Sequence, residues 1–303
     1  MGQEYAKVLK AQSVSFEAIG RGKLNCNAFR ENTGVVPFEN GIADFIIKKK
    51  SIPEFAIIAV GVEVLAQVTK ALLQHGVRNI LVEKPGVCFL DEIDDICNYS
   101  KIYEGKCYIA YNRRFYASVR HVRKMANLDG GIKSMHFEFT EWAHVVEKLE
   151  VNRLVLQNWF LANSSHVIDT AFFLSGKPVE MSCFTRGSLA WHSAASIFSG
   201  AGITDSGVVF SYQANWSGPG RWGLEIISPL NRYILRPFEK LYVQKIGTLS
   251  VEEIELDDRL DRDFKPGLYL QTEAFLKKNT EDLIPDQMQK EMIQNVYKKM
   301  CGH

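Results

Sequence analysis

The stretch FAIIAVGVEVLAQVTKALLQHGVRNILVEKPG, residues 55–86, decides the fold. Its ends, FAIIAV (55–60) and NILVEK (79–84), are short apolar runs typical of strands that are covered on both faces. The segment between them, VEVLAQVTKALLQHG (62–76), repeats apolar residues at helical spacing and ends at a glycine. A strand, a helix and a second strand in this order predict a βαβ unit, and therefore a parallel sheet.

The same alternation continues on both sides of this unit. Before it, VSFEAIG (14–20) is predicted to be a strand and GIADFIIKKK (41–50) an amphipathic helix. After it, DEIDDICNYSKI (91–102) has a helical pattern and CYIAYN (107–112) that of another strand. We therefore predict an α/β fold that opens with a Rossmann-like, dinucleotide-binding domain over residues 1–118.

The rest of the chain has a different pattern. SMHFEFTEW (134–142) alternates apolar and polar residues with a period of two, as a half-buried strand does. Four further strand candidates follow, at 207–216, 223–228, 232–237 and 240–246, with the predicted helix NSSHVIDTAFFLSG (163–176) before them. This pattern predicts a substrate and oligomerisation domain over 119–303, an α+β domain with an open, mostly antiparallel sheet.

Composition excludes several classes of protein. The chain has 303 residues, of which 46% are hydrophobic and 23% charged, as in a soluble protein of two globular domains. Its 36 basic and 35 acidic residues create no field that would gather nucleic acid, and no apolar run reaches the roughly 18 residues of a membrane span. The six cysteines have no metal-binding or disulfide spacing, so we expect free thiols, no metal and a cytoplasmic location.

The beginning of the sequence bears on cofactor binding. A dinucleotide-binding domain opens with a strand, a glycine-rich turn and a helix whose N-terminus holds the pyrophosphate. Here only a few residues precede the predicted helix EYAKVLKA (4–11), and Gly2 is the one glycine among them. We expect a Rossmann-like sheet that lacks its first strand and glycine-rich loop, with Gly2 as the last glycine of that loop or simply as the second residue.

Lys84 is the first candidate for chemistry. It ends a predicted buried strand in the sequence Val82-Glu83-Lys84-Pro85-Gly86. Ligands of open α/β sheets bind beyond the carboxyl ends of the strands. An ammonium group there can stabilise a substrate oxygen that becomes alkoxide-like during hydride transfer. The alternative is an ordinary solvated Glu-Lys pair at the end of a strand.

His166 is the second candidate, in the first turn of the predicted helix 163–176. An imidazole near a helix N-terminus is biased towards its neutral form, which a general base requires. Asp169 is within reach to orient it or to pair with a cation, and Asn163 or Ser164 is the expected N-cap. A hydrogen-bonded core histidine is the alternative.

Arginines provide further candidates. YNRRFY (111–116) places Arg113 and Arg114 beside an amide and aromatic rings, where they would hold a phosphate or carboxylate or form an interdomain salt-bridge cluster. Arg21 follows the second predicted strand, where an NAD-preferring domain carries an acidic residue, so it favours NADP unless it is an ordinary surface residue. The aromatic residues in Pro219-Gly220-Arg221-Trp222 and Ala190-Trp191-His192 fit either a sugar site or a sheet core.

Three motifs in this order resemble the Gfo/Idh/MocA oxidoreductases, which include glucose–fructose oxidoreductase and inositol dehydrogenase. They are EKPG (83–86), YNRRFY (111–116) and SSHVIDTAFFLSGKP (164–178). The resemblance implies a Rossmann domain followed by an open-faced sheet domain that supplies oligomer contacts and one wall of the active site. It implies that Lys84 is the catalytic lysine and His166 the proton-transferring histidine.

The resemblance also implies a function: NAD(P)-dependent hydride transfer to or from a sugar or nucleotide sugar, closest to members of surface-polysaccharide pathways. The expected cofactor contacts are Gly2, Arg21, Ala59, Val60, Glu83 and Lys84, and the expected substrate contacts are Asn112, Arg113, Asn163 and Asp169. Many relatives have an aspartate four residues before the histidine, where this chain has Ala162, so its substrate contacts differ. The expected assembly is a dimer or tetramer through the C-terminal sheet.

Two other functions stay open at this point. A sugar-binding or regulatory relative that has lost its cofactor would explain the missing glycine loop. A metal-dependent hydrolase would use His166, His192 and Asp169, although their spacing matches no known metal motif. The enzyme hypothesis requires Lys84 and His166, from different domains, to meet in one pocket.

Overall fold

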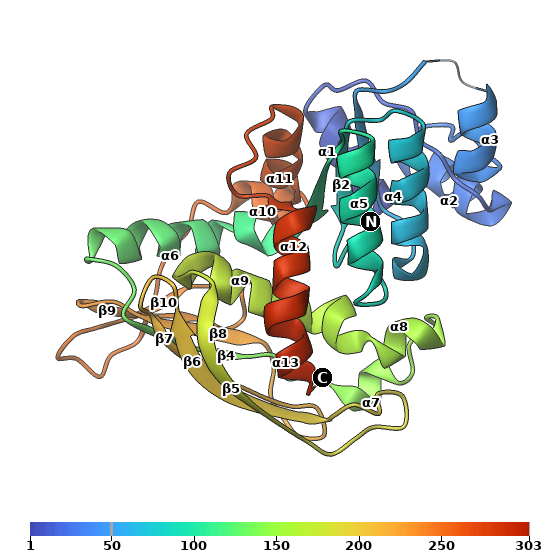
Figure 1. The fold of residues 1–303 in the computed structure, drawn as a ribbon. Coiled ribbons are helices and arrows are strands. Elements are labelled where there is room, and N and C mark those ends of the chain that lie inside the picture. Colours follow the sequence, from blue (N-terminus) through green and yellow to red (C-terminus); the bar gives the residue numbers. More distant parts are fainter. Residues whose placement is uncertain (49–50, 303) are drawn as a thin grey trace. The chain divides into compact units, whose positions relative to one another are not determined.

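The computed structural model describes residues 1–48 and 51–302 (Figure 1). The chain forms two compact units, each assembled from two segments. Unit 1 contains Met1–Ala110 and Leu260–Lys290, and unit 2 contains Tyr111–Arg259 and Glu291–His303. These units differ from the predicted continuous domains, 1–118 and 119–303, because residues 111–118 belong to unit 2 and residues 260–290 return to unit 1. The returning segment contains the helix Leu268–Leu276 and the strand Ile284–Pro285.

Unit 1 is built on a four-stranded sheet in the order β1-β2-β3-β12. Its strands are β1 (Phe55–Ile58), β2 (Asn79–Glu83), β3 (Lys106–Ala110) and β12 (Ile284–Pro285). The first three are parallel, and β12 runs antiparallel to β3. The turn Val62–Val64 and α4 (Leu65–Gln74) connect β1 to β2, and α5 (Glu92–Ile102) connects β2 to β3. The parallel sheet predicted from 55–86 is confirmed, with α4 and α5 packed side by side (Figure 1).

The segment 14–20 is not a strand, contrary to the prediction. Only Ile19 pairs, in an isolated parallel bridge with Phe38, through hydrogen bonds such as Gly20 N to Phe38 O at 2.9 Å. An extended segment becomes a strand only beside a partner, and no strand of residues 1–48 or 51–302 pairs with this one. The other helices of unit 1 are α1 (Gly2–Ala11), α2 (Lys23–Thr33), α3 (Gly41–Lys48) and α11 (Leu268–Leu276). The last two residues of the predicted helix 41–50 lie outside the described residues.

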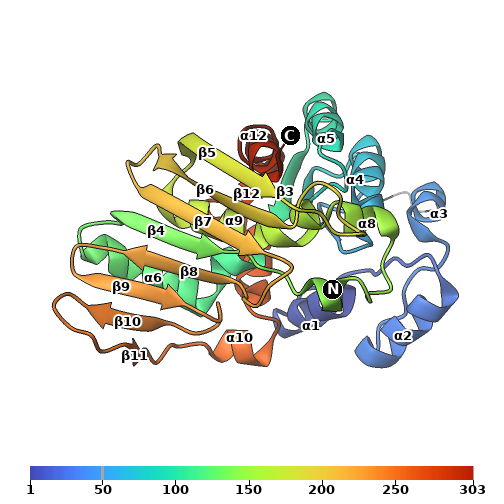
Figure 2. The ribbon, with the colours of Figure 1, turned by 90° about the horizontal axis from the view of Figure 1, so that it is seen from below.

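Unit 2 contains an eight-stranded sheet in the order β11-β10-β9-β8-β4-β7-β6-β5 (Figure 2). All neighbours are antiparallel except β4 and β7, so the predicted sheet type is confirmed. The strands are β4 (Ser134–Glu138), β5 (Pro178–Arg186), β6 (Ile197–Thr204), β7 (Val209–Asn215), β8 (Gly223–Ile227), β9 (Asn231–Leu235), β10 (Tyr242–Lys245) and β11 (Glu252–Glu253).

Three of these strands, β5, β6 and the two-residue β11, have no counterpart among the predicted strands. In β6, Gly200 and Gly202 interrupt the apolar pattern that identifies a strand. The structure explains both glycines: a Cβ on Gly200 would lie 2.5 Å from the Tyr212 hydroxyl, and one on Gly202 would lie 2.7 Å from the Phe210 ring. The aromatic rings of β7 thus lean across β6, where a side chain would otherwise stand.

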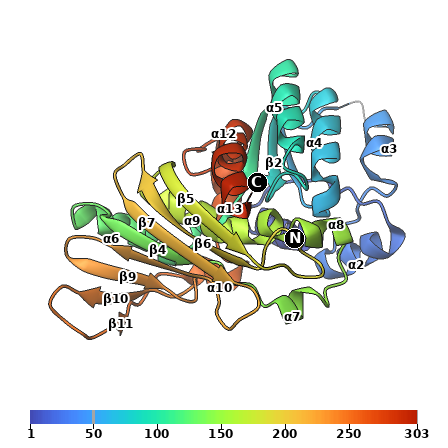
Figure 3. The same cartoon turned by 60° about the horizontal axis from the view of Figure 1, so that its bottom comes forward.

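The two faces of this sheet differ. The inner face carries Phe137, Phe210 and Tyr212, and the rings of Phe137 and Tyr212 stack with centroids 5.5 Å apart. The helices α6 (Ala117–Leu128) and α9 (Ser165–Ser175) cover it (Figure 3). The remaining helical segments are Asn112–Phe115, α7 (Ala143–Val146), α8 (Arg153–Gln157), the π-helix Phe160–Ser164, α10 (Arg259–Asp263), α12 (Asp286–Met292), the π-helix Ile293–Tyr297 and α13 (Lys298–Cys301). The outer face, called the open face below, carries exposed apolar side chains such as Phe184 and Val209.

All six cysteines are free, as expected. Throughout residues 1–48 and 51–302, every helix is too short or too polar to cross a membrane.

Candidate active site

The carboxyl end of β2 positions Lys84 through its neighbours. Glu83 is only 9% exposed, and its Oε1 accepts a hydrogen bond from the Tyr5 hydroxyl at 2.8 Å. Burial raises the pKa of the Glu83 carboxyl, while Tyr5 and the Lys84 ammonium group oppose that rise. On the other side, the Lys84–Pro85 peptide is cis, and the carbonyl of Pro85 accepts a hydrogen bond from Gln289 Nε2 at 2.9 Å. The backbone on both sides of Lys84 is therefore held in place.

Gly86 completes this turn. Its φ of +88° lies in the left-handed region, and an added Cβ would be 2.5 Å from Ile109 Cδ1 of β3. A larger residue would therefore have a strained backbone conformation and would require the Ile109 side chain to move.

The N-terminus of α1 lies beside the same strand end, because Tyr5 in its first turns reaches Glu83. Within the described residues no side chain caps this helix, and the N–H groups of Glu4 and Tyr5 donate to the carbonyl of Met1. Ala59 and Val60 follow β1 and leave the sheet at the edge where Lys84 leaves it, since Ile58 pairs with Val82 in parallel register. This edge and the adjacent N-terminus of α1 fit a nicotinamide dinucleotide.

For two of the predicted cofactor contacts, Gly2 and Arg21, packing in the structure does not require the residue that is present. A Cβ on Gly2 would meet the Phe29 ring at 3.7 Å, an ordinary contact, so packing alone does not require a glycine there. Arg21 is exposed and follows the bridge between Ile19 and Phe38, where its side chain also borders Gly41.

In unit 2, His166 lies in the first turn of α9, but this turn is not a free helix N-terminus. The π-helix Phe160–Ser164 runs directly into α9, and Ser164 has helical backbone angles. The predicted effect of the helix dipole on the imidazole therefore does not apply, because it is confined to a terminal turn. Asn163 and Ser164 cap nothing; both donate hydrogen bonds of 3.0 Å to Glu141 Oε1.

The His166 ring is 7% exposed and lies among aromatic rings. Its centroid is 5.9 Å from that of Tyr111, edge to face, and 6.1 Å from that of Trp222. Its Nδ1 is shielded from solvent. A π-helical turn is often found at a functional site, and this one directly precedes His166.

Asp169 pairs with a cation, which is the second of the two roles predicted from its position on the helix of His166. It is 1% exposed, and both of its carboxylate oxygens bind Arg114, with Nε to Oδ2 at 2.8 Å and Nη2 to Oδ1 at 2.6 Å. The Arg114 guanidinium also lies 4.7 Å from the centre of the Phe173 ring. This buried pair joins the segment 112–115 to α9, so neither residue is available to hold a substrate or to orient His166.

Arg113, the other arginine of the motif, lies in an aromatic cluster. Its Cζ is 4.6 Å from the centroid of Trp222 and 5.7 Å from that of Tyr116. Arg221 lies at the same distance from Trp222, 4.6 Å, and its Nη1 is 3.4 Å from Glu141 Oε2. Asn112, which directly precedes Arg113 in the chain, is buried. The predicted substrate contacts Asn112, Arg113 and Asn163 thus belong to the same unit as His166.

Sequence reasoning missed Tyr5 and Glu141. Neither belongs to a motif, and the only signal for Glu141 is an acidic residue at the end of an alternating strand pattern. Burial raises the pKa of the Glu141 carboxyl, against the opposing effects of Ser164, Arg221 and Asn163.

The metal set of the hydrolase hypothesis is not assembled. His192 is buried against Trp191 and Trp216, with its Nδ1 2.8 Å from the carbonyl of Ala195, and Asp169 binds Arg114. In the part of the chain that the structure describes, no three His, Cys, Asp or Glu residues form a group that could hold a metal ion.

Comparison with known proteins places the fold. No protein-family model matches the sequence, and no curated protein sequence does. Solved structures match over nearly the whole chain. Levoglucosan dehydrogenase, in complex with NADH and levoglucosan, is 15% identical with a TM-score of 0.77, over 99% of this chain and 93% of its own.

Two bacterial proteins are similar to the same extent. UDP-N-acetylglucosamine 3-dehydrogenase from Acidithiobacillus ferrooxidans is 14% identical with a TM-score of 0.74, over 99% of this chain and 93% of its own. An oxidoreductase from Agrobacterium radiobacter, in complex with NAD+, L-tartaric acid and magnesium, is 11% identical with a TM-score of 0.76, over the same shares. These neighbours are oxidoreductases of the Gfo/Idh/MocA type, and the present chain has their fold, as the resemblance implied.

Proposed function

We propose that this protein is an oxidoreductase that transfers a hydride between a nicotinamide cofactor and a hydroxyl or keto carbon of a sugar or nucleotide sugar. One observation carries the proposal: Lys84 lies at the carboxyl end of the central strand β2. The residues on either side of it accept hydrogen bonds from Tyr5 and Gln289. Such an edge is where ligands of α/β sheets bind. The fold shared with levoglucosan dehydrogenase and UDP-N-acetylglucosamine 3-dehydrogenase supports the same chemistry.

When bound, the nicotinamide ring accepts or supplies the hydride. We propose that Lys84 Nζ donates a hydrogen bond to the substrate oxygen and stabilises the negative charge that develops on it. His166 Nε2 accepts the hydroxyl proton during oxidation and returns it during reduction. Asn112 and Arg113 contact the substrate, whereas Asp169 stabilises the fold through Arg114.

Cofactor binding is the first test, and it separates the enzyme from a sugar-binding relative that has lost the cofactor. The full chain is titrated with NADH and NADPH, and cofactor fluorescence is followed. Saturable binding of at least one is expected from the enzyme. Absence of binding by both would contradict the proposed function and favour the non-catalytic relative.

The same titration tests the proposed preference for NADP. We expect NADPH to bind more tightly than NADH, because Arg21 would pair with the 2′-phosphate. Arg21→Gln should weaken NADPH binding by about tenfold and leave NADH binding unchanged, since one charged hydrogen bond is lost. Lys23→Gln, an exposed neighbour, serves as the control. Equal effects of Arg21→Gln on both cofactors would assign Arg21 no part in the choice.

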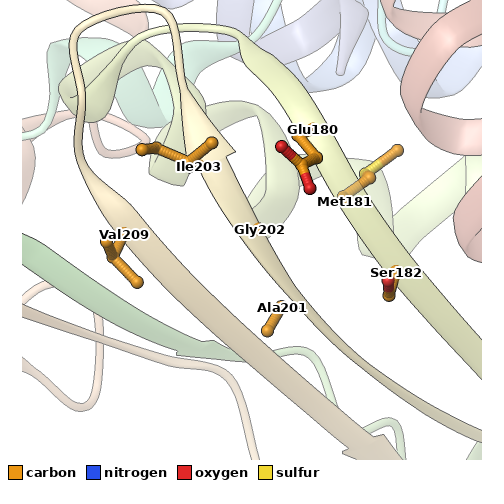
Figure 4. A pocket seen from close by; sticks show the side chains of 7 residues that line it. All are labelled: Glu180, Met181, Ser182, Ala201, Gly202, Ile203 and Val209. Atoms are coloured by element: carbon orange, nitrogen blue, oxygen red, sulfur yellow. The ribbon is translucent and has the colours of Figure 1, made fainter.

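We also propose that two copies of the chain associate through the open face of the large sheet. The strand register places Phe184, Val209 and Ile227 on this face, at 69%, 56% and 43% exposure. Glu225 and Arg232 supply both signs of charge there. The face has two shallow hollows of about 250 and 350 Å³, and Figure 4 shows the side chains around the first, on β5, β6 and β7. A face of this character suits a twofold contact with itself.

Sedimentation of the purified chain tests this assembly. Wild-type protein is expected at twice the mass of one chain or a higher multiple, and Phe184→Glu at the mass of a single chain, because it buries a charge in the contact. Leu128→Glu, on an exposed position of α6, should behave as wild type. A wild-type monomer at high concentration would contradict the proposal.

A further inference from the structure

Two guanidinium groups of unit 2 lie against a single indole ring. Arg113 and Arg221 each have their Cζ 4.6 Å from the centroid of Trp222. Trp142 extends the cluster, with its ring 5.0 Å from Arg221. The centroid of the His166 ring is 6.1 Å from that of Trp222, so the cluster adjoins the proposed catalytic base.

Two buried donors of this cluster have no acceptor. Among residues 1–48 and 51–302, neither Nε of Arg113 nor Nε1 of Trp222 makes a hydrogen bond, and both atoms are shielded from solvent. Trp222 as a whole is 8% exposed. Buried donors in folded proteins are nearly always paired, so two orphans in one stack indicate that a ligand supplies the acceptor.

The charges around the cluster leave Arg113 without a direct counter-ion. Glu141 binds Arg221 through Oε2, and its Oε1 is occupied by Asn163 and Ser164. Within the described part of the chain Arg113 forms no ion pair; Glu239 and Glu141 act on it only through space, and Arg221 repels it. A guanidinium stays protonated even when buried, so it favours an anionic partner.

We propose that Arg113, Trp222 and Arg221 form an anion subsite that binds a carboxylate or phosphate of the substrate. A guanidinium presents paired N–H donors that match both groups. Resting on the proposed function, this assigns the substrate to acidic sugars or sugar nucleotides rather than neutral sugars. Trp142 and Arg221 are partly exposed, which gives a ligand a way in from solvent.

Calorimetric titration of the full chain, without cofactor, tests the subsite. The probes are glucuronate, glucose and UDP, because glucose is the neutral counterpart of glucuronate and UDP presents phosphate alone. Wild-type protein is expected to bind an anionic probe at least about tenfold more tightly than glucose. Arg113→Gln should weaken that binding by about 10- to 100-fold and leave the binding of glucose unchanged, because it removes charge-assisted hydrogen bonds.

The probes also distinguish the source of the anion. If Arg113→Gln affects glucuronate alone, the subsite binds a sugar carboxylate; if it affects UDP alone, the subsite binds the phosphates of a nucleotide. Arg120→Gln, on an exposed position of α6, is the control and should match wild type. Arg221→Gln, at a partly exposed position, should weaken the same probe by a smaller factor and covers the case in which Arg113→Gln does not fold.

Two results would overturn the proposal: no saturable binding of either anionic probe by wild-type protein, or equal loss of anionic and neutral probes in Arg113→Gln. Because no cofactor is present, these outcomes are independent of NADH and NADPH binding. If the chain binds no nicotinamide cofactor but binds an anion through Arg113, the proposed function is contradicted and the proposed anion subsite is supported.

Discussion

Replacing Lys84 by methionine is expected to lower the turnover rate by about 10²- to 10³-fold, the usual effect of removing one group that stabilises a developing oxyanion. Methionine keeps the length and the apolar stem of the side chain but removes the charge. The rate is measured as the single-turnover change in NAD(P)H absorbance, with the sugar that wild-type protein converts fastest. Cofactor affinity is expected to change by less than about tenfold.

Two comparisons make this result specific. Lys101→Met, at an exposed position in the last turn of α5, should turn over as wild type does. Unfolding midpoints of both variants should stay close to that of wild type, which separates lost chemistry from lost structure. Undiminished turnover by Lys84→Met would reject the role of the ammonium group.

A double-mutant cycle tests whether Lys84 and His166 serve the same substrate. His166→Asn alone is expected to lower turnover by about 10²- to 10⁴-fold, as the loss of a general base does. If both groups act in one transition state, the double variant should be much less impaired than the product of the two effects, because residues that work as a unit are not additive. Effects that multiply fully would place the two residues in separate steps or sites.

Breaking the buried pair between Arg114 and Asp169 is the second large effect. Arg114→Met should lower the free energy of unfolding of the chain by about 3–5 kcal/mol, because it leaves a carboxylate at 1% exposure without its partner. Urea denaturation followed by fluorescence measures this loss. The double variant Arg114→Met with Asp169→Leu should recover part of the stability, since it removes the orphaned charge.

An exposed ion pair provides the matched control. Lys277, directly after α11, pairs with Glu273 at 2.7 Å, and its side chain is 70% exposed. Lys277→Met should therefore cost less than about 1 kcal/mol, since water solvates the remaining charge. A similar cost for Arg114→Met would show that Asp169 finds solvent or another partner, and that the pair does not anchor α9.

Segments with a regular period could be predicted from the sequence alone. The strands β1, β2 and β3 and the helices α4 and α5 each have their own apolar pattern, and their order implies a parallel sheet whatever the rest of the chain does. The position of Lys84 followed from the same reasoning, because the carboxyl end of such a strand is a ligand-binding edge. His166 and Arg113 are candidates from the residues themselves, and the resemblance to a family implies their roles.

Other features depend on partners that are distant in the sequence. Tyr5 and Glu83 lie 78 residues apart in the sequence, and Arg114 and Asp169 lie 55 residues apart. No local spacing can therefore predict either contact. The shared helix face suggests that Asp169 orients His166 or pairs with a cation. The structure shows which cation it is, an arginine from another segment that binds the carboxylate.

The sequence by itself determined the order of strands and helices and the chemical groups at the ends of the strands, because these depend on residues close together in the chain. Only the tertiary structure decided that 14–20 is not a strand, that β5 and β6 are, and that Arg113 rather than Arg114 lacks an ion-pair partner among the described residues. The physical reason is that hydrogen bonds, ion pairs and burial are settled by whichever groups meet in space, and a local pattern carries no information about groups that are remote along the chain.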